Sequence, residues 1–143
     1  MEPFRVVRDD MELGCFIDEK GIIQMRLRGN FSSDHLVEFN GWCNATTEAM
    51  KTVYAKDPKR VYSIIDVTGG WGFDQKVLTL LIKAARENRP YATKTAVFGA
   101  SMIMRSFMVI ARLKTGRGNI KSFKSRADAE CWLFTDGECN VIE

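Results

Sequence analysis

Two aspartates and several glycines lie at and just after the end of a β-branched and aromatic segment, residues 61–67, and have the composition of a ligand loop. Asp66 ends that segment and is a candidate general acid or base, because catalytic carboxylates are often placed where a buried strand ends. Glycine-rich loops between a strand and a helix also present backbone N–H groups that favour anions. The candidate loop site consists of Asp66, Thr68, Gly69, Gly70, Trp71 and Asp74.

A purely structural interpretation of this loop competes with the functional one. The glycine spacing matches neither common phosphate-binding motif, and Asp66 and Asp74 would repel an anion. Glycines permit turns with positive φ, and Asp74 can cap the helix that follows. Catalysis also needs a partner, but the single histidine, His35, comes just before a helix, where we expect it to be solvated. An enzyme that uses Asp66 and the glycine loop is therefore our third hypothesis.

The segment of residues 101–115 is unusually apolar for a helix that packs on a sheet. At about 100° per residue, Arg105 and Arg112 share one narrow line, and apolar side chains cover most of the remaining circumference. One face of a sheet cannot bury all of them, so another element, a second subunit or an apolar ligand must cover the rest. The predicted interface comprises Met104, Arg105, Met108 and Arg112.

We expect Met104 and Met108 on the outward side of this helix and Ile103 and Ile110 against the sheet. Methionine suits an interface because its thioether repacks against varied partners. A two-fold homodimer, the commonest closed assembly, would bury both methionines. Changing both to Glu is then expected to give folded monomers.

A basic cluster without aromatic residues interleaved in the manner of nucleic-acid-binding proteins begins at the end of this helix and continues beyond it. It contains Arg112, Lys114, Arg117, Lys121, Lys124 and Arg126. Such a cluster is usually a solvated surface, and contact with anionic lipid headgroups is a weaker alternative. The net charge of +3 is too small for the phosphate neutralisation that nucleic-acid binding requires. We expect neither nucleic acid as a partner nor stable membrane insertion.

The composition indicates an ordinary globular protein. A length of 143 residues with 45% hydrophobic residues predicts a single soluble domain over residues 1–143. Because no export signal or long uncharged apolar stretch occurs, we expect a cytoplasmic location. The four cysteines form no C-x-x-C pair, which predicts free thiols and, with one histidine, no zinc site. No metal or other cofactor is expected.

Hydrophobic periodicity predicts an α/β fold with the element order ββαβαβαβα. A leading hairpin precedes the central strand, residues 61–67. Because helices that alternate with strands make right-handed crossovers, the last three strands should be parallel, with helices packed on the sheet. The sequence predicts strands at 11–18, 21–28, 61–67, 93–98 and 119–123, and helices at 34–55, 74–88, 101–115 and 126–133.

Short residue groups at the ends of the predicted strands and in the last helix occur in an order that is found in a known protein family. They are Ile64-Ile65-Asp66-Val67-Thr68, Phe73-Asp74, Val97-Phe98-Gly99, Phe123-Lys124-Ser125, Ala129 and Trp132-Leu133. In this order they resemble the STAS domains, and more closely the SpoIIAA-like group of small bacterial proteins. The resemblance implies a mixed sheet with helices packed mainly on one face, related in shape to CRAL-TRIO lipid carriers. It also implies binding of partners or small ligands.

The resemblance bears on regulation as well. Anti-sigma-factor antagonists of this family are phosphorylated on a serine at the start of the helix after the central strand. Here Gln75 and Lys76 occupy those positions, so no phospho-switch is expected. The preferred hypothesis is a non-enzymatic regulatory or protein-interaction module. The alternative is a carrier of a small apolar or amphipathic ligand, which a cavity of about 300 Å³ or more beside the methionine-rich helix would favour.

Overall fold

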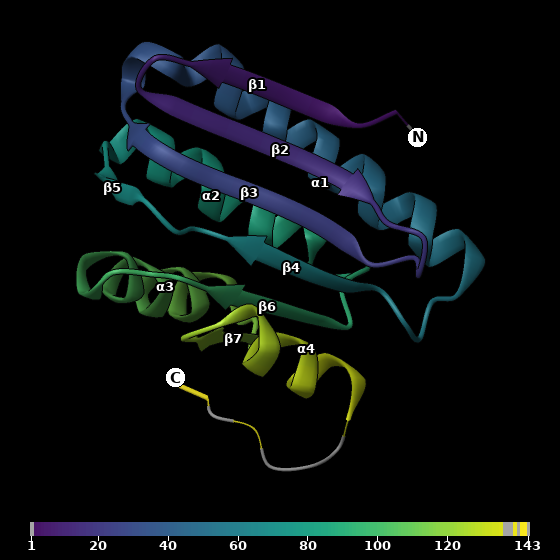
Figure 1. Cartoon of the computed structure of the whole chain (residues 1–143). Helices are drawn as coiled ribbons and strands as arrows, with labels where there is room; N and C mark the ends of the chain where they lie inside the picture. The colour runs from purple at the N-terminus through teal and green to yellow at the C-terminus, as the bar shows by residue number, and fades with distance from the viewer. Residues whose placement is uncertain (1, 136–138, 140, 143) are drawn as a thin grey trace.

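A mixed sheet in the order β1-β2-β3-β4-β6-β7, with β5 paired to β3, organises the chain (Figure 1). The computed structural model describes residues 2–135, 139, 141 and 142. The strands are β1 (Phe4–Arg8), β2 (Met11–Ile17), β3 (Ile23–Phe31), β4 (Tyr62–Asp66), β5 (Gly70–Phe73), β6 (Lys94–Phe98) and β7 (Ile120–Phe123). The helices are α1 (Leu36–Lys56), α2 (Gln75–Asn88), α3 (Met102–Thr115) and α4 (Arg126–Phe134), with a 3-10 turn (Ser33–His35) before α1.

The predicted leading hairpin and parallel half of the sheet are confirmed. Strands β2 and β3 pair antiparallel, and Gly21 at the turn between them has a φ of 79°. Strands β3, β4, β6 and β7 are parallel neighbours, with β4 near the centre as predicted. The sequence interpretation missed β1 and β5. β1 is an edge strand with a mostly exposed sequence, and β5 is only four residues long and includes two glycines.

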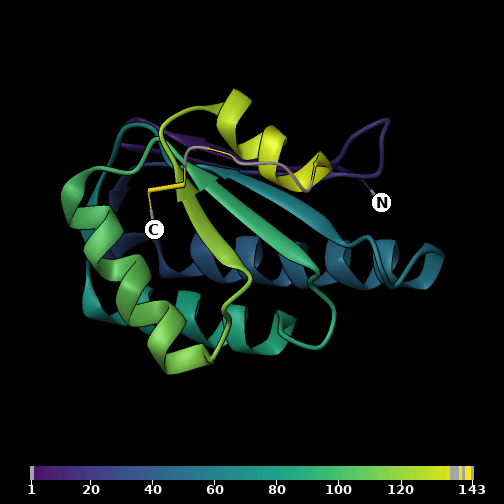
Figure 2. The same ribbon diagram turned by 90° about the horizontal axis from the view of Figure 1, so that it is seen from below.

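Three helices, α1, α2 and α3, cover one face of the sheet, and α4 lies on the other (Figure 2). The main core lies on the three-helix side, and a smaller cluster lies under α4. Neighbouring residues of β4 divide between the two, since Ile64 belongs to the smaller cluster and Ile65 packs against the main core. The prediction that helices pack mainly on one face is confirmed.

Side-chain caps fix where the later helices begin. Asp74 accepts a hydrogen bond from the backbone N–H of Lys76 at the start of α2, and Ser101 accepts one from Met104 at the start of α3. Such caps satisfy N–H groups that the first helical turn leaves unpaired. Among the described residues, no helix is long and apolar enough to cross a membrane.

Candidate functional site

The loop after β4 is closed by hydrogen bonds of its own. A carboxylate oxygen of Asp66 accepts from the backbone N–H of Thr68 at 2.9 Å. The backbone N–H of Gly70 donates to the carbonyl of Val67 at 3.0 Å, and the carbonyl of Gly69 accepts from Gly29 at 3.0 Å. The polar groups of this loop therefore hold the turn between β4 and β5.

The glycines and Asp74 have structural roles too. Gly69 has a φ of 81°, and a Cβ on Gly70 would lie 3.1 Å from the ring of Phe31. Asp74 caps α2, as the structural interpretation predicted. Trp71 lies in β5, but its side chain is outside the described part of the structure. The structure thus accounts for most of the predicted loop site without a ligand.

The single histidine is not solvated as expected. The ring of His35 is half-buried, with Nε2 lying 2.8 Å from Asp10 Oδ1 and Nδ1 lying 3.1 Å from Glu38 Oε2. Although partial burial opposes its charged form, the hydrogen bonds to Glu38 and Asp10 raise the pKa of His35. The sequence interpretation missed this cluster because Asp10 lies in the β1–β2 turn, 25 residues from His35.

The orientation predicted for α3 is wrong. Met104 is buried in the main core and Met108 is half-buried against it, whereas Ile103 and Ile110 are exposed. The cap at Ser101 fixes the start of α3, and the Met104 side chain lies beside Gly70, where it packs in the main core. Replacing Met104 by Glu would therefore disrupt the core rather than an interface.

The two arginines of the predicted interface lie between the inner and outer sides of α3. Both side chains are half-buried. Arg112 Nη1 donates to the carbonyl of Ile120 at 3.3 Å, while the buried Arg105 Nε has no hydrogen-bond partner among the described atoms. Neither guanidinium belongs to the most exposed part of the helix.

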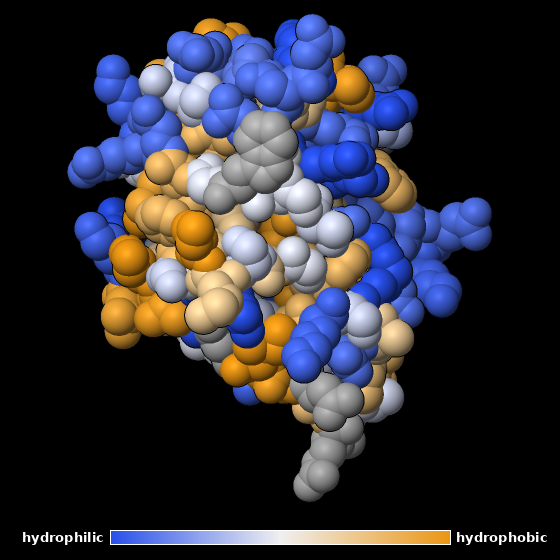
Figure 3. All heavy atoms as spheres, turned by 60° about the vertical axis from the view of Figure 1, so that its left-hand side comes forward, coloured by the Kyte–Doolittle hydropathy of each residue, from blue (hydrophilic) through white to orange (hydrophobic). Residues whose placement is uncertain are grey.

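A different apolar surface is exposed on α3. We call it the outer face of α3, and it comprises Met102, Ile103, Val109, Ile110 and Leu113. Met102 is 76% exposed and Leu113 is 80% exposed. Apolar residues gather over the middle left and lower centre of the side shown in Figure 3, and its upper part is mainly hydrophilic. The predicted surplus of apolar surface on this helix is therefore real, but other residues provide it.

A pocket of about 140 Å³ lies beneath α3, between that helix, α2 and the sheet. Met104, Phe107 and Met108 line it from α3, and Leu81 and Ala85 line it from α2. Its volume is below the value of about 300 Å³ that would favour a lipid-sized ligand.

One wall of this pocket carries a buried cation. Arg117, in the turn between α3 and β7, is only 4% exposed. Its Nη2 donates to Thr95 Oγ1 at 2.7 Å and its Nε donates to Asn119 Oδ1 at 3.2 Å. Burial lowers the pKa of Arg117 to about 10, so the guanidinium stays charged at neutral pH. The sequence placed Arg117 in a solvated basic cluster, and nothing in the local pattern distinguished it.

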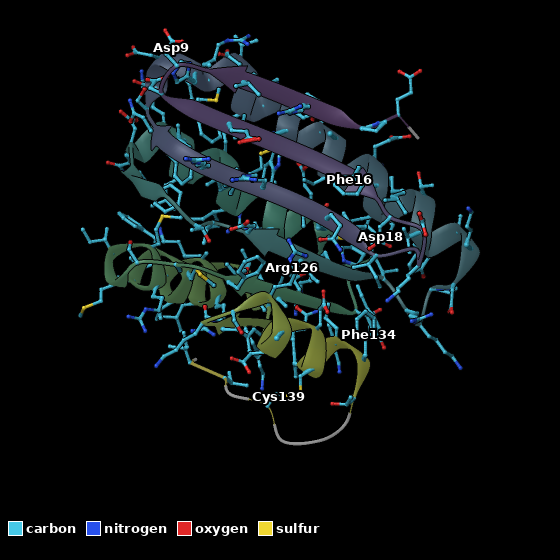
Figure 4. The ribbon with its side chains drawn as sticks, in the orientation of Figure 1. Asp9, Phe16, Asp18, Arg126, Phe134 and Cys139 are labelled. Atoms are coloured by element: carbon cyan, nitrogen blue, oxygen red, sulfur yellow. A yellow bond between two sulfur atoms is a disulfide. The ribbon has the colours of Figure 1, made fainter. Side chains whose placement is uncertain are left out.

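The expectation of four free thiols is also wrong. Cys131 of α4 and Cys139 of the following tail form a disulfide; Figure 4 labels Cys139 below α4. Cys15 and Cys43 are free and buried, and burial raises the pKa of each thiol to about 12. Disulfides are rare in reducing compartments, so this bond does not favour the cytoplasmic location, which stays a prediction.

No protein-family model matches the sequence, and no curated protein is significantly similar to it.

Proposed function

We propose that this chain is a non-enzymatic, STAS-like regulatory module that acts through protein association, and that it pairs with a second copy of itself through the outer face of α3. The observation that carries the proposal is the exposure of five large apolar side chains on one side of a single helix. Apolar surface gathered in this way is typical of an interaction site.

The order of side chains along the outer face suits a two-fold pair. Met102 and Ile103 lie at one end, Ile110 and Leu113 lie at the other, and the small Ser106 lies between them. In an antiparallel pair, each end of one helix would pack on the opposite end of its copy, with the two serines near the crossing. The Ser106 hydroxyl already donates to the carbonyl of Met102 at 3.1 Å, so its burial leaves no donor unpaired.

The charges on α3 predict how this self-association depends on salt concentration. The ionisable residues of α3 are Arg105, Arg112 and Lys114, and no acidic residue accompanies them in the helix. Two copies therefore repel each other electrostatically, and added salt screens that repulsion. We expect self-association to strengthen with salt, whereas binding to an anionic surface would weaken.

Analytical ultracentrifugation of the wild type at about 100 μM should show dimers, since association follows mass action. The double variant Met102→Glu, Leu113→Glu should be a folded monomer, because both side chains are exposed, and its melting temperature should not depend on protein concentration. Val37→Glu is the matched control: Val37 is 82% exposed on α1 and lies outside the outer face, so this variant should still dimerise.

A monomeric wild type at this concentration would overturn the proposal. Binding of such a monomer to phosphatidylglycerol vesicles, lost in the double variant, would assign the outer face to a lipid surface instead. Met104→Glu marks the inner side of the same helix: it should destabilise the fold by roughly 3 kcal/mol or more, because it buries a carboxylate in the core.

The other two hypotheses have less support. The pocket beneath α3 is about 140 Å³, below the value of about 300 Å³ that would favour a carrier of small apolar or amphipathic ligands as the main function. An enzyme built on the glycine loop is disfavoured because backbone N–H groups engage both Asp66 and Asp74.

A further inference from the structure

Arg117 is a buried cation without an anion. Among the described residues, no carboxylate forms an ion pair with it, and its acceptors, Thr95 and Asn119, are both neutral. These two hydrogen bonds use two of the five N–H groups of a guanidinium, which leaves three for a ligand. Burying a charge without a counter-charge is costly, so a ligand that supplied an anion here would be bound favourably.

The pocket that Arg117 lines is otherwise almost wholly apolar. Met108 and Phe107 line the pocket from α3, and Val97 and Ile120 line it from the sheet. Asn88, which is 5% exposed, adds a second polar group; its Oδ1 accepts from Thr47 Oγ1 at 2.8 Å, and its amide nitrogen remains a donor. The polar part of the lining therefore favours negative charge, and the remainder favours hydrocarbon.

We propose that the pocket beneath α3 binds a small carboxylate with an apolar tail, whose carboxylate pairs with Arg117. Guanidinium and carboxylate form paired, charge-assisted hydrogen bonds, which are among the strongest that a buried site can make. The ligand supplies the anion that the fold lacks.

The volume sets the size of the tail. A dry apolar cavity of about 150 Å³ is known to hold benzene. A pocket of about 140 Å³ therefore accepts a tail of about five or six carbons, or one aromatic ring. Fatty acids of membrane-lipid length are excluded.

The charges around the turn support entry of an anion. The guanidinium of Arg89 lies over Gly116, and Arg86 Nη2 donates to the carbonyl of Lys114 at 3.1 Å. The one acidic side chain of α2, Glu87, pairs with Lys83 at 3.8 Å. The turn that carries Arg117 therefore has positive charge around it, and this favours association with an anion.

Hexanoate is the probe that fits this chemistry, with hexan-1-ol as the neutral probe of equal chain length and acetate as the carboxylate without a tail. NMR titration of the 15N-labelled protein should show hexanoate binding at least about tenfold tighter than either control, because neither control makes both contacts. The Nε–H resonance of Arg117 should shift with hexanoate and not with hexan-1-ol.

Two variants test the two halves of the site. Arg117→Met removes the charge at similar volume, and it should reduce hexanoate binding to the level of hexan-1-ol. Ala111→Leu fills the pocket from α3 and should abolish binding of both while Arg117 is retained. Arg5→Met, at an exposed arginine of β1 on the opposite edge of the sheet, is the matched control and should change hexanoate affinity by no more than about twofold.

Equal binding of hexanoate and hexan-1-ol, undiminished hexanoate binding by Arg117→Met, or no binding of hexanoate at millimolar concentration would each overturn the proposal. The test is independent of the proposed dimer, which involves the opposite side of α3. Arg117→Met should still dimerise, and Met102→Glu, Leu113→Glu should still bind hexanoate.

Discussion

Arg117 and His35 are both basic side chains withdrawn from water, but their surroundings are opposite. His35 lies between two carboxylates, those of Asp10 and Glu38, at the end of the molecule where β1 turns into β2. Arg117 lies at the end of α3 between a hydroxyl and an amide oxygen. The first region contains the anions that its base requires, and the second does not.

The difference separates stability from binding. A base whose anionic partners belong to the fold adds to the free energy of unfolding, and removing that base should lower this free energy. A buried base without an anion adds little to the free energy of unfolding. Its positive charge can instead pair with an anionic ligand. The three tests below ask whether the two regions differ in this way.

The largest effect is expected at Gly29, which packs on the turn that carries Asp10. It has a φ of 93°, and a Cβ there would lie 2.2 Å from the carbonyl oxygen of Asp10. Gly29→Ala should lower the free energy of unfolding by about 3 kcal/mol or more, as measured by urea denaturation.

Gly116, beside Arg117, is the matched glycine. Its φ is 67°, but a Cβ would meet only the guanidinium of Arg89, at 3.4 Å. Gly116→Ala should therefore cost only about 1 kcal/mol, the ordinary penalty of the left-handed conformation. Similar costs for both glycines would show that the Arg117 turn is packed as rigidly as the His35 region.

An intermediate effect is expected from Thr95→Val. The Thr95 hydroxyl accepts from Arg117 at 2.7 Å and from Ser63 at 2.9 Å, so the substitution leaves two buried donors unpaired. It should cost about 2 kcal/mol in the wild type. In the Arg117→Met background the cost should fall by about 1 kcal/mol, which a double-mutant cycle measures. Equal costs in both backgrounds would mean that Thr95 does not stabilise the guanidinium.

The smallest effect is a pH dependence of the His35 region. The pKa of His35 is raised from its ordinary value of 6.5, so its charge stabilises the fold below that value and the benefit is lost as pH rises through the raised pKa. The pKa of Glu38 is lowered from 4.5, mainly by the hydrogen bond to His35, so its benefit is lost as pH falls through that lowered pKa. The melting temperature should therefore fall as pH rises through the neutral range.

His35→Gln should flatten this part of the melting profile, because the sequence contains no other histidine. Scanning calorimetry of both proteins from about pH 5 to pH 9 provides the comparison. A variant that keeps the wild-type slope would assign the slope to another group.

Much of the fold could be predicted because local patterns and tertiary packing agree. The alternation in β3, the β-branched β4 and the caps at Asp74 and Ser101 each indicate one structure only. Strand β1 could not be predicted in this way, since its mostly exposed residues carry no strong alternation and pair only because β2 offers an edge.

The candidate sites were harder to predict for a physical reason. Helix periodicity predicts which residues share a side of α3, but not which side faces the sheet. Met104 was therefore predicted to face outward and Ile103 to face the sheet, whereas the structure has the reverse. Similarly, the burial of Arg117 depends on contacts with Thr95, 22 residues earlier. From charge and spacing in the sequence alone, such an arginine is predicted to be exposed, like the basic residues near it.

The bond between Cys131 and Cys139 has a consequence for the edge of the sheet. Strand β7 would present unpaired backbone groups, but Val141 bridges to Phe123 and the N–H of Ile142 donates to the carbonyl of Ser122 at 2.8 Å. The disulfide holds the tail two residues before Val141, which keeps this short cover at a high effective concentration. Natural proteins protect such edges against intermolecular strand addition. We therefore expect oxidation of these two cysteines to reduce aggregation through β7.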